Sequence, residues 1–348
     1  SLYWSREGKH EKAEALAKES TVFAETARNN ALIAQTNNWL GVQYNIKHLP
    51  KLSLVHYEAA WEAVEALDWP EQKQIIRFNM AAIYPQLERH TEAMTIFEQS
   101  IDWPLFNVNA TRRLVRQSAM TSSLIGIGDA VRAETELQKL VPELFDKVQN
   151  DTKILAYNSL GEAQLAQGKL PEALASFQSA IGLFDSTSSP NPRGQAVLVP
   201  YGGALRQAGR PAEALDVIDS VIEQLDLNSP NDLLRNAMLE RAAILTDMGD
   251  SQGAGAAARE AQKVSDQLNS DALIYQISRL KTSIELEQSN QELALARERE
   301  AALEKEAIRA KTLRYLLLAM GGLLLAVGYL LFSRHLQARV AQTERAVN

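Results

Sequence analysis

The sequence predicts an all-α protein, a right-handed solenoid of paired helices followed by a long helix and a single transmembrane helix. Three observations lead to this fold class. A pattern of small and bulky apolar residues recurs about every 40 residues over positions 1–271. A highly charged segment without Gly or Pro follows the repeats, and an uncharged run of 18 residues follows that segment.

The composition excludes several classes of protein. Hydrophobic residues make up 46% of the 348 positions, which is enough to bury a core and excludes wholesale disorder. The net charge of −7 argues against a nucleic-acid-binding protein, because such proteins carry a basic surface. The absence of cysteine excludes disulfide scaffolds, thiol nucleophiles and zinc sites with cysteine ligands.

The clearest repeat unit lies in the middle of the chain. It predicts two helices joined by a turn at Gly168. On the second helix, Ala173, Phe177 and Ala180 recur at i, i+4 and i+7, so they share one face. The small residue Gly161 on the first helix allows the two helices to approach closely.

The same unit returns in a nearly constant register. Equivalents of the Gly161 position, at steps of 40 or 41 residues, are Ser1, Gly41, Ala81, Thr121, Gly161, Gly202 and Ala242. The turn position is occupied by Gly8, His48, Glu88, Gly128, Gly168, Gly209 and Gly249. The bulky position on the second helix is occupied by Ala17, Tyr57, Phe97, Leu137, Phe177, Ile218 and Ala258. The register predicts about seven repeats within residues 1–271.

This pattern resembles the tetratricopeptide repeat (TPR) over residues 1–269. The usual unit has about 34 residues. Each unit here is about six residues longer, which implies an additional helical turn or longer connections. The resemblance implies stacked helix pairs in a solenoid, a fold that serves many different partners.

Both ends of the chain suggest missing segments. The first repeat lacks most of its first helix, because Ser1 already occupies the position of Gly161. A helix cannot bury its apolar face without its partner, so we expect the repeat to be truncated and the protein to extend upstream. Residues 334–348 are expected to begin a helical linker to a missing downstream domain.

Residues 272–312 are expected to form a capping helix and then a charged linker helix. Two interpretations remain open for this segment, a solvated single helix and a parallel coiled coil. In the second, a homodimer would form through residues 286–331. Its core positions would be Leu286, Leu293, Glu300, Ala307 and Arg314, alternating with Ser289, Ala296, Leu303, Ala310 and Leu317.

Residues 313–333 are predicted to form the transmembrane helix. The run from Tyr315 to Phe332 contains no charged residue over 18 positions. A helix of that length covers about 27 Å, close to the hydrocarbon thickness of a bilayer. Arg314 and Arg334 flank the run as interfacial anchors. A buried core helix is the alternative, but such a helix does not need every face to be apolar.

The sequence contains no catalytic motif. There is neither a phosphate-binding loop of the Gly-x-x-x-x-Gly-Lys type nor a His-Glu-x-x-His metal motif. His10, His48 and His90 lie in or next to predicted turns, and no histidine has a partner at metal-ligand spacing. We therefore expect no enzyme activity in this segment, no cofactor and no metal.

The concave side of the solenoid is the expected binding surface, because the first helix of each pair lines it. Amide side chains there would suit an extended peptide backbone, since they both donate and accept hydrogen bonds. An ordinary polar groove wall is the other interpretation. The inward positions are Asn38, Asn45, Phe78, Gln86, Ser118, Ser122, Asn158, Glu162, Arg206 and Gln207.

A solenoid, a charged helix and a single span together resemble the sensory half of bacterial membrane receptors of the histidine-kinase (two-component) or diguanylate-cyclase type. The resemblance implies a bacterial cytoplasmic membrane, a periplasmic solenoid and a cytoplasmic output domain. Six basic residues lie within about 18 positions before the span and three follow it, which taken alone would favour the opposite orientation.

We therefore expect the solenoid to relay binding of a ligand or partner protein through the long helix to an absent output domain. The alternative is a membrane-tethered scaffold that recruits protein partners without any output domain.

Overall fold

The computed structural model describes residues 10–107, 109–183, 192–225 and 229–347. Within those ranges the chain forms helices and short turns and contains no strand, so the predicted all-α fold class is confirmed. The chain divides into two compact units, Ser1–Ser278 and Arg279–Asn348. We call the first the solenoid unit and describe each unit separately.

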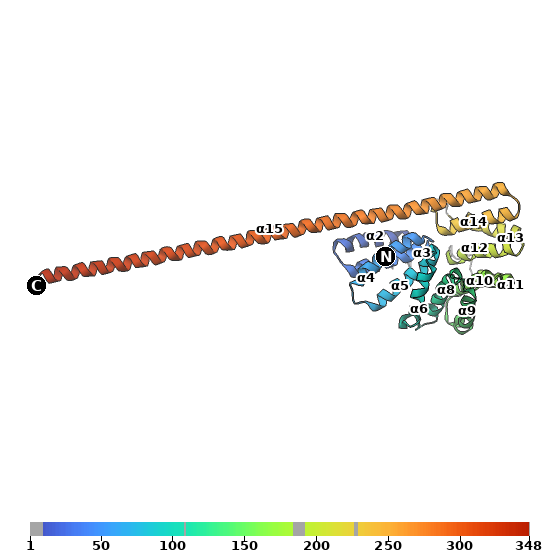
Figure 1. Ribbon diagram of the computed structural model, residues 1–348, viewed down its shortest axis with the longest axis horizontal. Coiled ribbons are helices and arrows are strands. Elements are labelled where there is room, and N and C mark those ends of the chain that lie inside the picture. Colours follow the sequence, from blue (N-terminus) through green and yellow to red (C-terminus); the bar gives the residue numbers. More distant parts are fainter. Residues whose placement is uncertain (1–9, 108, 184–191, 226–228, 348) are drawn as a thin grey trace. The chain divides into compact units, whose positions relative to one another are not determined.

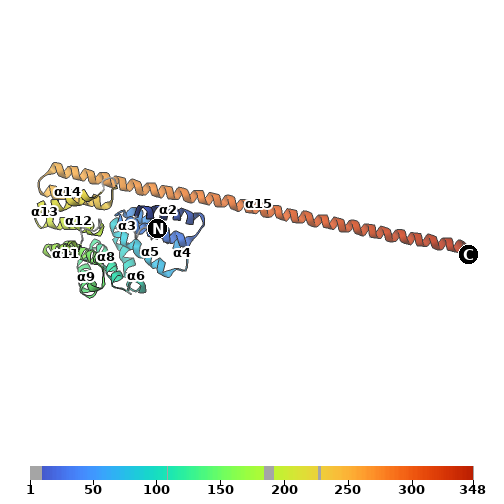
Figure 2. The same cartoon turned by 180° about the vertical axis from the view of Figure 1, so that it is seen from behind.

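The solenoid unit consists of consecutive helices that pack side by side as pairs (Figures 1 and 2). The first helices of successive pairs are α3 (Asn30–Ile46), α5 (Pro70–Ile83), α8 (Ala110–Gly126), α10 (Asn150–Ala166), α12 (Pro192–Gln207) and α14 (Asp232–Asp247). The second helices are α2 (His10–Thr26), α4 (Pro50–Glu65), α6 (His90–Ser100), α9 (Ala130–Leu144), α11 (Leu170–Gly182) and α13 (Pro211–Gln224). Short helices α7 (Pro104–Asn107), η1 (Tyr84–Leu87) and η2 (Phe145–Lys147) complete the unit together with the start of α15 (Ser251–Val347).

The turns within the pairs lie where the register predicts them. Gly128, Gly168, Gly209 and Gly249 have φ angles between 74° and 85°, a backbone conformation that glycine adopts without steric cost. His48 and Glu88 occupy the same position with φ angles of 56° and 58°. The first predicted turn residue, Gly8, lies outside the described residues. The six described turns therefore confirm the register.

The small and bulky positions of the register meet inside each pair. A Cβ atom added to Gly41 would lie 2.5 Å from the ring of Tyr57, and one added to Gly161 would lie 2.6 Å from the ring of Phe177. Tyr57 and Phe177 are at most 1% exposed. Glycine is thus required at these two crossings, where the ring from the second helix lies directly against the first helix, which is the close approach that the sequence predicts.

Helix α15 is continuous from the last repeat to the end of the described chain. It begins at Ser251 as the second helix of the last pair and ends at Val347. The expected boundary between residues 271 and 272 falls inside this helix. No Gly or Pro occurs between residues 256 and 320, so nothing in the sequence interrupts the helical hydrogen bonds.

The apolar part of α15 has exposed side chains throughout. Its stretch from Gln291 to Gln337 includes a segment that is long and apolar enough to cross a membrane, and none of that segment is buried. Leu324 and Leu325, for example, are 68% and 77% exposed. The segment is therefore not a buried core helix.

Candidate functional site

The predicted groove residues lie on the first helices of the pairs, as the register requires. Helices α8, α10, α12 and α14 contact one another in succession and form one wall, and α3 contacts α5. The placements are Asn38 and Asn45 on α3, Phe78 on α5, Gln86 on η1, Ser118 and Ser122 on α8, Asn158 and Glu162 on α10, and Arg206 and Gln207 on α12.

In the repeats that precede the wall, an amide pair joins α3 and α5. The Nδ2 atom of Asn79 donates a hydrogen bond of 2.9 Å to Oδ1 of Asn38, which connects α5 to α3. Asn38 and Asn45 are both half-buried, whereas Gln86 is exposed. The Oδ1 atom of Asn38 therefore already contributes to the contact between repeats.

Phe78 belongs to the core rather than to an exposed wall. It is 6% exposed, and its ring centroid lies 4.3 Å from that of Phe106 and 5.6 Å from that of Phe97. Phe106 comes from α7, a short helix inserted between the third and fourth pairs. The sequence register contains no information about this inserted helix, so it did not reveal that the ring of Phe78 packs in the core.

Asn158 and Glu162 form a coupled polar pair one turn apart on α10. The Nδ2 atom of Asn158 donates a 3.0 Å hydrogen bond to Oε1 of Glu162. Burial raises the pKa of Glu162 to about 7, and this hydrogen bond partly opposes the rise. Among the described residues, the Oδ1 atom of Asn158 is buried and has no hydrogen-bond partner. The pair thus offers an unused acceptor beside a carboxyl group that titrates near neutrality.

Arg206 is held between two carboxylates. Its Nε atom lies 2.7 Å from Oε1 of Glu240, and its Nη1 atom lies 3.1 Å from Oδ2 of Asp247, both on α14. One positive charge faces two negative charges here, so the cluster carries a net negative charge at neutral pH. Arg206 is consequently engaged with neighbouring protein groups and links α12 to α14.

An open hollow of about 380 Å³ lies beside this cluster. Its lining comes from three first helices, namely Leu165 on α10, Val199, Pro200, Gly203 and Gln207 on α12, and Asn236, Leu239 and Glu240 on α14. Leu239 is 50% exposed. A Cβ atom at Gly203 would lie 3.5 Å from the carboxyl group of Glu240, an ordinary van der Waals contact at the edge of the hollow.

The wall has a polar part in its earlier repeats and an apolar part around the hollow. One register position is polar in three of the earlier repeats, at Asn38, Ser118 and Asn158, and apolar in the last two, at Val199 and Leu239. The sequence analysis selected Asn38, Phe78, Ser118 and Asn158 from this series and missed Val199 and Leu239. The signal that could have found them was present in the register, since the equivalent residues follow at the same step.

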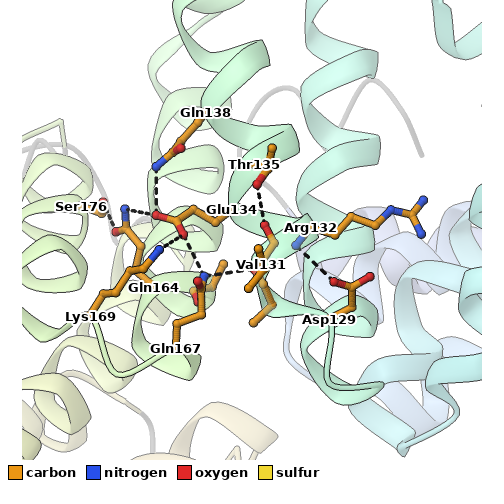
Figure 3. Close-up of polar contacts among 12 residues, drawn as sticks. Asp129, Val131, Arg132, Glu134, Thr135, Gln138, Gln164, Gln167, Lys169 and Ser176 are labelled. Atoms are coloured by element: carbon orange, nitrogen blue, oxygen red, sulfur yellow. Dashed lines mark hydrogen bonds and ion pairs between the residues drawn. The ribbon is translucent and has the colours of Figure 1, made fainter.

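A second polar cluster lies between repeats rather than on the wall. Glu134 on α9 is 6% exposed. Its carboxylate accepts hydrogen bonds from Gln138 at 2.9 Å, Gln164 at 3.3 Å, Gln167 at 2.9 Å and Lys169 at 2.6 Å (Figure 3).

Burial alone would raise the pKa of Glu134. The hydrogen bonds from Lys169, Gln167 and Gln164 outweigh this effect and lower the pKa below its usual value. Every oxygen of the carboxylate is used in joining α9 to α10 and to the turn before α11, so the cluster has a structural role.

Nothing in the described ranges forms a group of three or more His, Asp or Glu side chains suited to hold a metal ion.

The comparisons with known proteins concern the fold. No protein-family model matches the sequence, and no curated protein matches it. Among solved structures, NprR in complex with its cognate peptide NprX has a TM-score of 0.55 at 13% identity, over 76% of this chain and 82% of that chain. A Rap protein complexed with Competence and Sporulation Factor has a TM-score of 0.53 at 15% identity, over 70% and 77% of the two chains.

The Rap conjugation gene regulator of plasmid pLS20, in complex with the Phr* peptide, has a TM-score of 0.52 at 13% identity and covers 71% and 77% of the two chains. Identities this low establish similarity of fold alone. The chain has a TPR-like helical-repeat fold followed by a long apolar helix.

Proposed function

We propose that the solenoid unit binds a peptide segment along the wall formed by α8, α10, α12 and α14. The observation that carries this proposal is the open hollow of about 380 Å³ between α10, α12 and α14, beside polar side chains at equivalent positions of the preceding repeats. The similar structures of NprR and of two Rap proteins contain bound peptides or factors, which supports the same class of ligand here.

The polar part of the wall suits the main chain of the peptide. An extended peptide presents N–H and C=O groups that lose water on binding and need new partners. On the wall, Asn158 of α10 is an amide that both donates and accepts. Asn45 on α3 and the exposed Gln86 on η1 are further amides in the repeats that precede the wall. These residues, with Asn38, Glu162 and Arg206, are the ones we assign to ligand contact or to shaping the wall; Phe78 supports them from the core.

The apolar part suits one large aliphatic side chain of the peptide. Val199, Leu165 and the half-exposed Leu239 line the hollow, and burying a leucine-sized group there would contribute about 1.5–3 kcal/mol. Because Glu240 and Asp247 outnumber Arg206 at its edge, a basic group beside the aliphatic residue is favoured. The expected ligand is a peptide that combines an aliphatic and a basic residue.

The binding experiment uses the full chain in detergent and a library of fluorescent octapeptides read by anisotropy. We expect saturable binding that is strongest for peptides with adjacent aliphatic and basic residues. Leu239→Asp should weaken the best peptide at least tenfold, since it places a charge in the hollow. The matched control, Val131→Asp, changes an apolar residue that is 63% exposed on the second helix α9, and should leave binding unchanged.

Absence of saturable binding by any peptide would contradict the proposed function. Equal weakening by the two variants would instead mean that the hollow is not the binding site.

We also propose that the apolar part of α15 anchors the protein in a bacterial cytoplasmic membrane as a single span. The support is an uncharged run of 18 residues whose side chains are not covered by protein. Resistance of the protein to extraction with alkaline carbonate tests the anchor. A phosphatase reporter inserted after Asn269 tests the periplasmic placement of the solenoid, because that enzyme is active only in the periplasm.

The relay to an output domain is the more specific form of this proposal, and a tethered scaffold is its alternative. A relay through residues 286–331 requires two copies of α15 to lie side by side. Cysteines introduced at Leu303 and Leu317 should then crosslink in membranes, which is easy to detect because the natural sequence has no cysteine. Monomers alone would exclude the dimeric relay and favour the scaffold.

A further inference from the structure

Two distant segments of the solenoid unit touch each other. In an array of stacked repeats, each repeat is expected to contact only its neighbours. Here the backbone N–H of Asp232, at the start of α14, donates a 2.9 Å hydrogen bond to the carbonyl oxygen of His48, in the turn between α3 and α4. The Nζ atom of Lys51 also donates to Oδ1 of Asn269 on α15, 218 residues further along the chain.

The same two segments line a second, small hollow. The turn and the start of α4 contribute Leu49, Pro50, Lys51 and Leu52, and the other side consists of Asp232, Arg235, Leu268, Asn269 and Asp271. Leu49 and Leu52 also pack against the core of their own repeat, next to Leu40 and Tyr44. The turn is therefore held by its own repeat and presents a defined surface to the last one. Both views show α3 next to the beginning of α14 within this unit (Figures 1 and 2).

The charges across this contact are complementary. Lys51 on the early side faces Asp232, Asn269 and Asp271 on the late side. Asp232 is half-buried, and burial raises its pKa, whereas the positive charges of Arg235 and Lys51 act in the opposite direction. Arg235 also lies 2.6 Å from Oδ1 of Asp232 on the same helix. Lys51 is thus the positive charge that crosses from one segment to the other.

We propose that His48 and Lys51 on one side, and Asp232, Asn269 and Asp271 on the other, form a latch that closes one turn of the solenoid. The latch consists of a few polar contacts, whereas neighbouring repeats share apolar cores such as the one around Phe177. It is the weakest of these interfaces and opens first. Opening separates the early from the late repeats and changes the curvature of the wall between them. A ligand that spans that wall binds the open and closed forms differently and so shifts the latch equilibrium.

The test measures the distance across the latch directly and needs no ligand. Nitroxide labels are attached to Glu65→Cys on α4 and Gln267→Cys on α15, both exposed, in the full chain held in detergent. The chain contains no other cysteine, so only these two sites are labelled. Pulsed electron spin resonance then gives the distribution of distances. For the labelled protein without substitutions in the latch, we expect one narrow population of label-to-label distances.

Lys51→Glu reverses the charge that faces Asp232 and Asp271, and we expect the distribution to shift to longer distances and to broaden. Adding Asn269→Lys places a positive charge opposite the glutamate introduced at position 51, creates an opposite-charge pair across the latch and should return the short distance. The matched control is Lys139→Glu, the same charge reversal at an exposed lysine of α9 far from these segments in sequence, and it should change nothing.

Circular dichroism verifies that each variant remains folded, and the rescued double variant controls for damage that Lys51→Glu causes on its own. A Lys51→Glu distribution that superimposes on the starting one would overturn the proposal. So would a broad, long-distance population before any latch residue is changed.

Discussion

The leucines of the solenoid unit and those of the apolar part of α15 are the same residue in opposite surroundings. Leu40, Leu114 and Leu137 are 0% exposed because each lies on the apolar stripe of a helix that has a partner. Leu324 and Leu325 lie on a helix that is apolar on every face and are more than two thirds exposed. Since exposing apolar surface to water costs about 25 cal/mol per Å², burial of the first group holds the fold together, whereas the second group is left uncovered by the protein.

The largest effect is expected from removing a core side chain in the solenoid unit. Phe177→Ala deletes a ring that is fully buried against Gly161 and should lower the free energy of unfolding by about 3–5 kcal/mol. Chemical denaturation followed by circular dichroism measures it. Phe332→Ala, at a ring that is 64% exposed, is the control and should leave the solenoid transition where it was. Similar losses of unfolding free energy for both variants would show that the buried and the exposed rings do not differ in their contribution to stability.

The next effect concerns the apolar helix and should not appear in the solenoid. Leu324→Arg places a charge near the centre of the uncharged run, which costs about 2.5–3.5 kcal/mol of insertion free energy. The measurement is the fraction of protein that remains with membranes after carbonate extraction. Leu303→Arg, in the charged part of α15, should leave that fraction unchanged. If Leu324→Arg remained fully in membranes, the run would not be embedded in lipid.

A polar interface inside the solenoid gives a smaller effect that depends on pH. Glu134→Ala leaves Lys169 and three glutamine side chains without their shared acceptor, and should lower stability by about 2–3 kcal/mol at pH 7. The folded pKa of Glu134 is lowered, so its contribution is complete above its ordinary pKa and disappears as the pH falls through the lowered value.

Denaturation curves of the starting protein and of Glu134→Ala at several pH values should therefore show that their difference in the free energy of unfolding becomes smaller in acid. Glu143→Ala, at an exposed glutamate paired with Arg113, is the matched control and should change stability little at any pH. A difference for Glu134→Ala that stayed constant down to strongly acidic pH would show that its charge does not stabilise the fold.

The smallest effect compares two glycines of neighbouring helices. Gly161→Ala forces a Cβ atom against the ring of Phe177 and should cost about 1–2 kcal/mol. Gly182→Ala meets no atom within 4 Å and should instead stabilise slightly, by about 0.4–1 kcal/mol, because alanine restricts the unfolded chain. Thermal melts of the two variants should move in opposite directions. Shifts of the same sign would mean that close packing at Gly161 is not what requires glycine there.

The candidate groove was predictable in part. The register placed Asn158, Glu162 and Arg206 on successive first helices, because side-chain direction on a helix follows from spacing alone. It did not reveal that α7 covers Phe78, or that Arg206 is occupied by Glu240 and Asp247. Those facts depend on segments from other repeats, whose approach is a matter of packing rather than of periodicity.

The amino-acid sequence alone determined the paired helices, the positions of their turns, the contact of Gly161 with Phe177 and the uncharged run of α15. Each of these follows from local backbone preference or from a repeating apolar pattern, and both depend only on the order of residues in the sequence. Only the tertiary structure decided that Val199 and Leu239 border an open hollow, that four donors meet at Glu134, and that His48 meets Asp232. The first two depend on how neighbouring repeats pack against each other, and the third arises where the small rotation between stacked pairs accumulates over several repeats; no spacing within one repeat encodes either.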